Sequence, residues 1–200
     1  FNSLIRKLPA VETLGSVTYI CTDKTGTLTK NKMYAEQVFV NKQVYERNSL
    51  SPIKDQEEVM LLLHAFALNN DAVEDGEQNI KGDSTEIALM EVAREQNISP
   101  SVWPRLAELV FDADRKLMTT FHPYGDKIIS FTKGAPDILL TRCVNINIDE
   151  LEQQVDEMAA KGQRVLGFAY RYWDSLPGTT DSKLHEYDLQ FLGLAGIIDP

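Results

Sequence analysis

A short apolar run that ends on an aspartate restricts the fold of this chain more than any other feature. Residues 17–20 are Val-Thr-Tyr-Ile, and they lead directly into residues 21–29, CTDKTGTLT. The run 17–21 predicts a buried strand, which is rigid and poor in water, followed by a turn rich in hydroxyl groups. Backbone N–H groups and hydroxyls of such a turn are suited to hold phosphate oxygens and a metal ion beside a carboxylate. Asp23 is therefore a candidate nucleophile.

The four residues 23–26, Asp-Lys-Thr-Gly, are by themselves also compatible with an ordinary polar turn. The longer string 21–29 closely resembles the phosphorylation motif of P-type cation-transporting ATPases, and residues 9–16 resemble the family's lead-in to that motif from the membrane. This resemblance implies that Asp23 becomes an aspartyl phosphate. It also implies a Mg²⁺ ion on the Asp23 carboxylate and the Thr25 carbonyl, with Lys24 and the Thr25 hydroxyl contacting phosphate.

The residue two places after the nucleophile separates two classes of enzyme. Phosphatases of the haloacid-dehalogenase type share the strand and the aspartate but carry a second aspartate at this place, which acts as a general acid and base. Thr25 stands there in this chain. Without that group a phosphoenzyme should persist, as a pump requires. A soluble phosphatase stays the alternative, and a non-catalytic binding module is a third class.

The charge and the cysteines limit the partners and the compartment. The chain has 200 residues, with 30 acidic and 20 basic residues and a net charge of −10. Nucleic-acid binding needs an excess of Lys and Arg, so no nucleic-acid partner is expected. The two cysteines, Cys21 and Cys143, are far apart in apolar surroundings, which argues against a disulfide framework and favours a reducing compartment.

An almost continuous apolar run at 191–198 predicts a second strand that is covered on both faces. The residues between the two runs mix helices and strands in an α+β order. The expected strands are 36–45, 109–111, 117–122, 127–132 and 165–172, and the expected helices are 56–68, 87–96, a short one from about 135, and 149–161. A capping box at 83–86 precedes the second helix, and Gly162 ends the last one.

The resemblance implies a division of this α+β chain into three parts. Residues 1–33 would be the N-terminal part of a haloacid-dehalogenase-like α/β phosphorylation domain. Residues 34–188 would be an inserted nucleotide-binding domain with an antiparallel sheet flanked by helices. Residues 189–200 would be the return strand toward the phosphorylation domain, and the chain would be an excised piece of a longer protein.

Two segments are suited to bind a nucleotide. Residues 133–137, Lys-Gly-Ala-Pro-Asp, stand where a strand ends and a helix begins, so that Lys133 can meet an anion and Gly134 lets a ligand approach the backbone. Phe111 and Lys116 offer an aromatic face and a cation close together, and an adenine ring stacks well on such a face. Spacing alone favours a solvated lysine at 133 and a core phenylalanine at 111.

Both segments, and two further ones, resemble nucleotide-binding motifs of P-type ATPases. In residues 82–89 the resemblance implies that Glu86 approaches the adenine amino group, although Glu86 is equally suited to complete the helix cap. In residues 162–166 it implies that Arg164 reaches toward the phosphates. Calcium pumps of the sarcoplasmic reticulum type carry an arginine where this chain has Ala113, which predicts somewhat weaker binding.

The expected function is therefore the ATP-binding part of a P-type pump, acting with ATP and Mg²⁺ on the cytosolic face of a membrane. Residues 11–16 look most like the pumps for Ca²⁺ or for Na⁺ and K⁺, and we expect Ca²⁺ with Na⁺/K⁺ as the alternative. No apolar stretch reaches the roughly 20 residues that span a bilayer. The piece itself should be soluble and bind nucleotide without turnover, because the actuator, the remaining phosphorylation domain and the transmembrane parts are its missing partners. No metal site is expected at His64, His122 or His185.

Overall fold

The computed structural model describes residues 15–19, 32–75, 79–178 and 185–199, and the chain divides into the units Phe1–Asn31 and Lys32–Pro200. In the first unit, residues 17–19 form no strand, and their side chains are exposed. The strand expected at 17–21 is wrong for these three residues, because a strand needs a paired neighbour and the described residues provide none for them. Ile20 and Cys21 lie outside the described residues.

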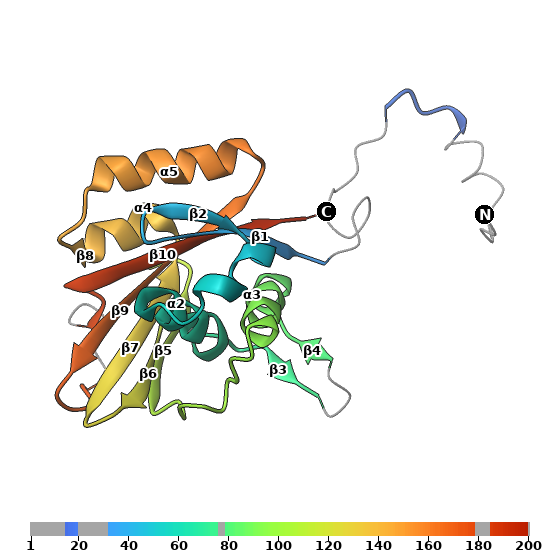
Figure 1. Ribbon diagram of the computed structural model, residues 1–200. Helices are drawn as coiled ribbons and strands as arrows, with labels where there is room; N and C mark the ends of the chain where they lie inside the picture. Colours follow the sequence, from blue (N-terminus) through green and yellow to red (C-terminus); the bar gives the residue numbers. More distant parts are fainter. Residues whose placement is uncertain (1–14, 20–31, 76–78, 179–184, 200) are drawn as a thin grey trace. The chain divides into compact units, whose positions relative to one another are not determined.

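One antiparallel sheet forms the centre of the second unit (Figure 1). Its strands are β1 Tyr34–Val40, β2 Gln43–Glu46, β5 Ala107–Asp112, β6 Leu117–Tyr124, β7 Lys127–Gly134, β9 Arg164–Trp173 and β10 Leu189–Ile198. Their order is β2-β1-β10-β9-β7-β6-β5, and β8 (Cys143–Val144) pairs in parallel with β10. The short strands β3 (Val73–Glu74) and β4 (Ile80–Lys81) form a separate hairpin. The expected α+β class with an antiparallel sheet is confirmed.

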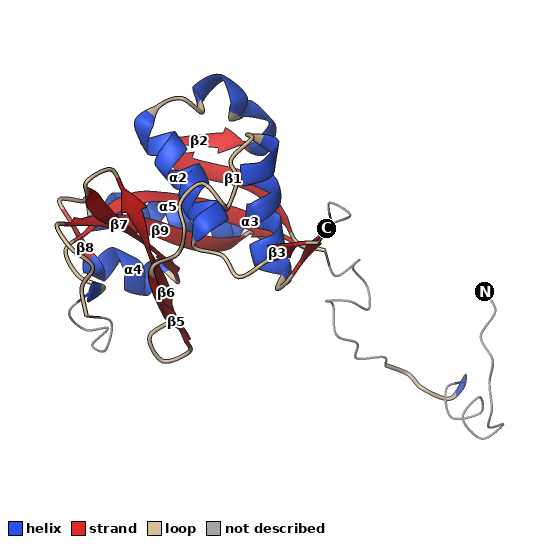
Figure 2. Cartoon of the chain, turned by 90° about the horizontal axis from the view of Figure 1, so that it is seen from below, coloured by secondary structure: helices blue, strands red, loops and turns tan. Residues whose placement is uncertain are grey.

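Helices cover both faces of this sheet. Helices α2 (Glu57–Leu68) and α3 (Ser84–Glu95) lie together against β1 on one face (Figure 2), and α4 (Pro136–Leu139) and α5 (Ile148–Ala160) lie on the other. Short 3₁₀ turns η1 (Arg47–Ser49) and η2 (Ser51–Ile53) lie between β2 and α2, and η3 (Leu140–Arg142) follows α4. On β1, Val38 and Val40 pack under α2 and α3, whereas Phe39 packs with Leu151 and Met158 of α5. This alternation is what a strand between two cores requires.

Strand β10 lies inside the sheet, between β1 and β9. Ala195, for example, is opposite both Val38 of β1 and Leu166 of β9. The expected domain boundary between residues 188 and 189 is therefore wrong, since residues 189–198 belong to the same sheet and the same unit as the strands before them. The apolar run indicates burial on both faces, but it carries no information about which sheet the strand joins.

The single strand expected at 36–45 is a hairpin. Asn41 and Lys42 have φ angles of 52° and 60°, and they form a tight turn between β1 and β2. Two-residue hairpin turns of this hand need two residues with positive φ, and Asn-Gly or Gly-Gly is their usual signal. The expected helices and the remaining strands are confirmed within a few residues, and Gly162, with φ 80°, ends α5 as expected. None of the described helices is both long and apolar enough to span a membrane.

Two buried histidines pack around Trp103. Its indole ring stacks on His64 with the ring centroids 4.4 Å apart, and its carbonyl oxygen lies 3.2 Å from Nδ1 of His122. His122 is 1% exposed, and its Nε2 lies 2.9 Å from Oγ1 of Thr120. Burial lowers the pKa of His122 from 6.5 to about 4, so the folded state holds this ring neutral.

We expect the free energy of unfolding to decrease as the pH falls from about 6.5 toward about 4, because the unfolded chain binds a proton at His122 that the folded chain excludes. The full shift corresponds to about 3 kcal/mol. Urea unfolding at several pH values should show that His122→Asn has a weaker pH dependence than the unchanged chain. The pKa of His64 is also lowered by burial, but His64 is present in both proteins, so its contribution to the pH dependence cancels in the comparison. Equal pH dependence in the two proteins would contradict the prediction.

Candidate functional site

A cleft of about 580 Å³ at one edge of the sheet brings together all six residues predicted to bind nucleotide. Glu86 comes from α3, Phe111 from β5, Lys116 from the turn before β6, Lys133 and Gly134 from β7, and Arg164 from β9. Further lining residues are Asp71, Asp83, Thr85, Leu89, Met118, Ala135, Pro136, Val165 and Leu166. The cleft therefore draws on segments far apart in the chain.

Strand register explains why these segments meet. Lys133 is opposite Met118 of β6 on one side and Phe168 of β9 on the other. Lys116 immediately precedes β6, and its carbonyl accepts a hydrogen bond of 3.2 Å from the Ala135 N–H at the end of β7. The end of β7 thus lies beside the beginnings of β6 and β9, and one cation lies in or directly next to each of these strands.

A buried ion pair forms the floor of the cleft. Lys133 is 8% exposed, and its Nζ donates hydrogen bonds to Oε1 of Glu86 at 2.5 Å and to the Asn69 carbonyl at 2.8 Å. Burial lowers the pKa of Lys133, and the Glu86 carboxylate opposes this shift. The paired carboxylate favours the charged form of this buried lysine.

Glu86 binds Lys133 rather than completing the helix cap. At the start of α3, the Asp83 carboxylate accepts a hydrogen bond from the Thr85 N–H at 2.9 Å, which is the expected first half of the capping box. The Glu86 side chain is directed to Lys133 on β7 instead. The expected second half of the box is wrong, because the long-range ion pair satisfies this carboxylate.

The rim of the cleft is aromatic and cationic. The ring of Phe111 is 60% exposed, so this residue is not part of the core. Lys116 has a φ of 53°, and its Nζ lies 3.5 Å from the Asp137 carboxylate. Arg164 is exposed, and its Nη1 lies 3.4 Å from Oγ1 of Thr85. A flat apolar face beside two accessible cations matches the shape of a ligand with an aromatic base and anionic groups.

Gly134 lines the cleft and is also needed for strand packing, whereas its expected role in the approach of a ligand stays a prediction. A Cβ atom at this position would lie 2.1 Å from the Lys116 carbonyl oxygen and 2.8 Å from Cδ2 of Leu117. These atoms belong to the neighbouring strand and its preceding turn. The glycine thus lets the Lys116 backbone lie against β7, which positions the lysine at the rim.

Arg105 is a contributor to this site that the sequence did not indicate. Its Nη1 donates to Asp71 at 2.7 Å and to Glu108 at 2.5 Å, and its Nη2 donates to the Asn70 carbonyl at 2.6 Å. The guanidinium thereby joins the segment after α2 to β5, the strand that carries Phe111. The polar residues 69–71 signal the end of a helix, but no local pattern reveals a partner more than thirty positions away.

Asp23, Lys24 and Thr25 lie outside the described residues, so their catalytic and Mg²⁺-binding roles stay predictions. Within the described part of the chain, no group of three or more His, Cys, Asp or Glu side chains is arranged to hold a metal ion. The fit of Mg²⁺ therefore depends on the predicted oxygen ligands of Asp23 and Thr25, which are of the hard type that Mg²⁺ prefers.

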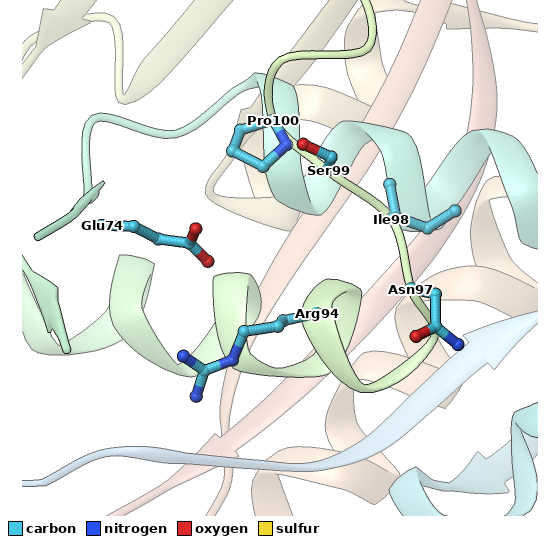
Figure 3. A pocket seen from close by; sticks show the side chains of 6 residues that line it. All are labelled: Glu74, Arg94, Asn97, Ile98, Ser99 and Pro100. Atoms are coloured by element: carbon cyan, nitrogen blue, oxygen red, sulfur yellow. The ribbon is translucent and has the colours of Figure 1, made fainter. Parts of the chain in front are cut away.

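A second cavity, of about 510 Å³, lies elsewhere on the second unit (Figure 3). It is lined by Glu74, Arg94, Asn97, Ile98, Ser99 and Pro100, and the side chains of Glu74 and Arg94 extend toward it from β3 and α3. Among the described residues, its lining shares no member with that of the cleft and includes no aromatic side chain. The cleft that contains Phe111 is therefore the better candidate for binding a nucleotide.

The second unit is thus an α+β domain in which helices cover both faces of an antiparallel sheet. Its cleft contains an aromatic ring and several cations. Residues 58–200 match the family model described as P-type ATPase, cytoplasmic domain N. Because this match covers more than half of the chain, the chain belongs to the P-type ATPase family.

Relatives match the whole chain. It is 39% identical to Calcium-transporting ATPase 1 of Bacillus cereus and 36% identical to Calcium-transporting ATPase 1 of Lactococcus lactis. It is 31% identical to the Sodium/potassium-transporting ATPase subunit alpha-3 of Rattus norvegicus. Each match covers 100% of this chain and 24% of the relative, so the chain spans about a quarter of their length.

We predict that Glu86→Gln lowers the free energy of unfolding by about 3 kcal/mol near neutral pH, because it leaves the Lys133 ammonium buried without its counter-charge. Adding Lys133→Met to this variant should restore most of the loss, since no buried charge then remains unpaired. Urea unfolding of the two single variants and the double variant measures both effects. A double variant as unstable as the sum of the two single variants would show that the pair is not coupled.

Proposed function

We propose that this chain is the ATP-binding cytosolic part of a P-type ATPase that couples ATP hydrolysis to cation transport across a membrane. The observation that carries the proposal is the cleft, in which the exposed ring of Phe111 lies on the same cavity as the buried pair of Lys133 and Glu86. Membership of the family, and the match to its cytoplasmic domain N, support the same conclusion.

In the proposed complex, the adenine ring of ATP stacks on Phe111, which is accessible for this purpose. The Glu86 carboxylate has one oxygen bonded to Lys133, and its remaining acceptor capacity is available to the adenine amino group. Lys116 and Arg164, at the rim, balance the charge of the phosphates. In this complex the adenine contacts the aromatic ring and the carboxylate, and the phosphates contact the cations of the same cleft.

The proposed reaction begins when an oxygen of the Asp23 carboxylate attacks the γ-phosphorus of ATP in line with the leaving group. The bond from that phosphorus to the bridging oxygen breaks, ADP leaves, and an aspartyl phosphate remains. Mg²⁺, held by Asp23 and the Thr25 carbonyl, neutralises phosphate oxygens when bound. Lys24 adds positive charge, and Thr25 supplies no general base, so the acyl phosphate persists until other parts of the protein hydrolyse it.

We propose Ca²⁺ as the transported ion, with Na⁺ and K⁺ as the alternative. Two bacterial relatives at 36% and 39% identity are named calcium-transporting ATPases, whereas the relative named for sodium and potassium is 31% identical. The proposed partners are an actuator domain, a haloacid-dehalogenase-like phosphorylation domain containing residues 1–33, and transmembrane segments of the same polypeptide. In this proposal the cleft lies on the cytosolic face of a membrane.

Phe111→Ala should raise the Kd for ATP about tenfold, because it removes a stacking surface from the cleft. Val110→Ala is the matched control, since Val110 is 61% exposed on the same strand but does not line the cleft. Isothermal titration of both variants with ATP, with NMR amide shifts to locate the bound nucleotide, provides the measurement. Equal affinities in the two variants, or no amide shifts near Glu86 and Lys133 at millimolar ATP, would exclude this site.

The transport part of the proposal requires the full-length protein in membranes. Asp23→Asn should abolish the incorporation of acid-stable, hydroxylamine-sensitive phosphate from ATP labelled at the γ-position, because an amide oxygen is a poor nucleophile. Incorporation should depend on Ca²⁺ in the unchanged protein, and Phe111→Ala should shift only the ATP concentration that is needed. Incorporation that requires Na⁺ instead would replace Ca²⁺ by the alternative ion, and labelling that survives Asp23→Asn would contradict the assigned nucleophile.

A further inference from the structure

A second buried ion pair lies beneath the rim of the cleft without lining it. Glu186 is 2% exposed, and its Oε1 accepts hydrogen bonds from Nη1 of Arg115 and from Oγ1 of Thr119, the latter at 2.9 Å. The Thr119 hydroxyl also lies 2.9 Å from the hydroxyl of Thr132. The Glu186 carboxylate is thus bonded to β6 as well as to the turn that precedes it.

Arg115 connects this carboxylate to the turn that carries the rim. Its Nη2 donates a hydrogen bond of 2.5 Å to the carbonyl of Val110, the residue before Phe111. Its backbone N–H donates to the Asp112 carboxylate at 2.9 Å. One guanidinium therefore holds the strand end at Phe111 and Glu186 at the same time, which a planar group with several fixed N–H donors is suited to do.

The guanidinium adds to the contacts that the rim already has, because the Lys116 carbonyl accepts a hydrogen bond from the Ala135 N–H and Nζ of Lys116 lies 3.5 Å from the Asp137 carboxylate. Phe111 is mostly exposed, and Lys116 adopts a left-handed backbone conformation that is unfavourable for a residue with a side chain. The Lys116 N–H donates to the Asp112 carbonyl at 2.6 Å, which closes the turn but does not fix its direction. Removing the guanidinium or its carboxylate would free the turn to sample other orientations.

We propose that Glu186 and Arg115 are positioning residues, which hold the Phe111 ring and the Lys116 ammonium in the arrangement that binds ATP. This inference rests on the proposed function of the cleft. A rim that is ordered before binding does not have to be ordered by the nucleotide, so the cost of ordering is removed from the binding free energy. Neither residue lines the cleft, and both act through the turn between β5 and β6.

The test is a cycle of variants titrated with ATP. Glu186→Gln should raise the Kd about fivefold in the otherwise unchanged chain, because ordering of the rim then opposes binding. In the Phe111→Ala background it should raise the Kd by only about twofold, since the ring is absent and only the Lys116 ammonium is left to be positioned. Urea unfolding should show the same loss of stability from Glu186→Gln in both backgrounds. Arg115→Lys keeps the charge but loses the two-pronged contact, and it should repeat the pattern with a milder loss of stability.

Glu95→Gln is the control, because it removes one of two carboxylate partners of another buried arginine, Arg47, whose Nη2 lies 2.6 Å from Oε1 of Glu95 and 3.6 Å from Oε2 of Glu91, away from the cleft. It should lower stability and leave the Kd unchanged. If Glu95→Gln raises the Kd as much as Glu186→Gln does, or if Glu186→Gln and Arg115→Lys leave the Kd unchanged, the positioning role is overturned. An equal rise of the Kd in both backgrounds would overturn it too. A failure of the proposed function is separate, because Phe111→Ala alone would then leave the affinity for ATP unaltered.

Discussion

The contact between the Lys133 ammonium and the Glu86 carboxylate joins the sheet to helix α3, and the shape of the cleft depends on it. Taking two such charges out of water costs several kcal/mol, and a pair of packed apolar side chains would often be at least as stable. Stability alone therefore gives no reason for an ion pair at this place. A ligand that uses the carboxylate and the ammonium gives one, because it adds hydrogen bonds that an apolar pair cannot make.

Three arginine or lysine side chains connect the cleft to the rest of the fold in the same manner. Lys133 joins β7 to α3, Arg105 joins β5 to the segment after α2, and Arg115 joins the rim turn to Glu186. Each is paired with a carboxylate and also donates a hydrogen bond to a backbone carbonyl, so contacts in two directions fix the position of its cationic group. The exposed parts of the site, Phe111 and Lys116, thus lie beside these ionic contacts.

Periodicity predicted most of the elements, whereas the six residues predicted to bind nucleotide, all of which line the cleft, were indicated by the resemblance of short motifs to those of P-type ATPases. The hairpin at Asn41 and Lys42 was not predicted, since neither residue is the glycine that usually marks such a turn. The place of β10 inside the sheet was also missed, because an apolar run reports burial but not pairing partners. Arg105, Arg115 and Glu186 could not be found for a related reason, as their roles arise from pairings between residues far apart in the chain.

The net charge of −10 adds a constraint on the cleft that the local contacts do not reveal. An anionic nucleotide approaches a chain whose overall field repels it, so the accessible cations at Lys116 and Arg164 must overcome that field over a short distance. Lys133 contributes less to this attraction, because the adjacent carboxylate of Glu86 cancels most of its field beyond the cleft floor. We therefore expect the cleft to bind a ligand through short-range contacts, without long-range electrostatic attraction. Salt screens the repulsion by the overall field as well as the attraction by Lys116 and Arg164, so its two effects on binding oppose each other.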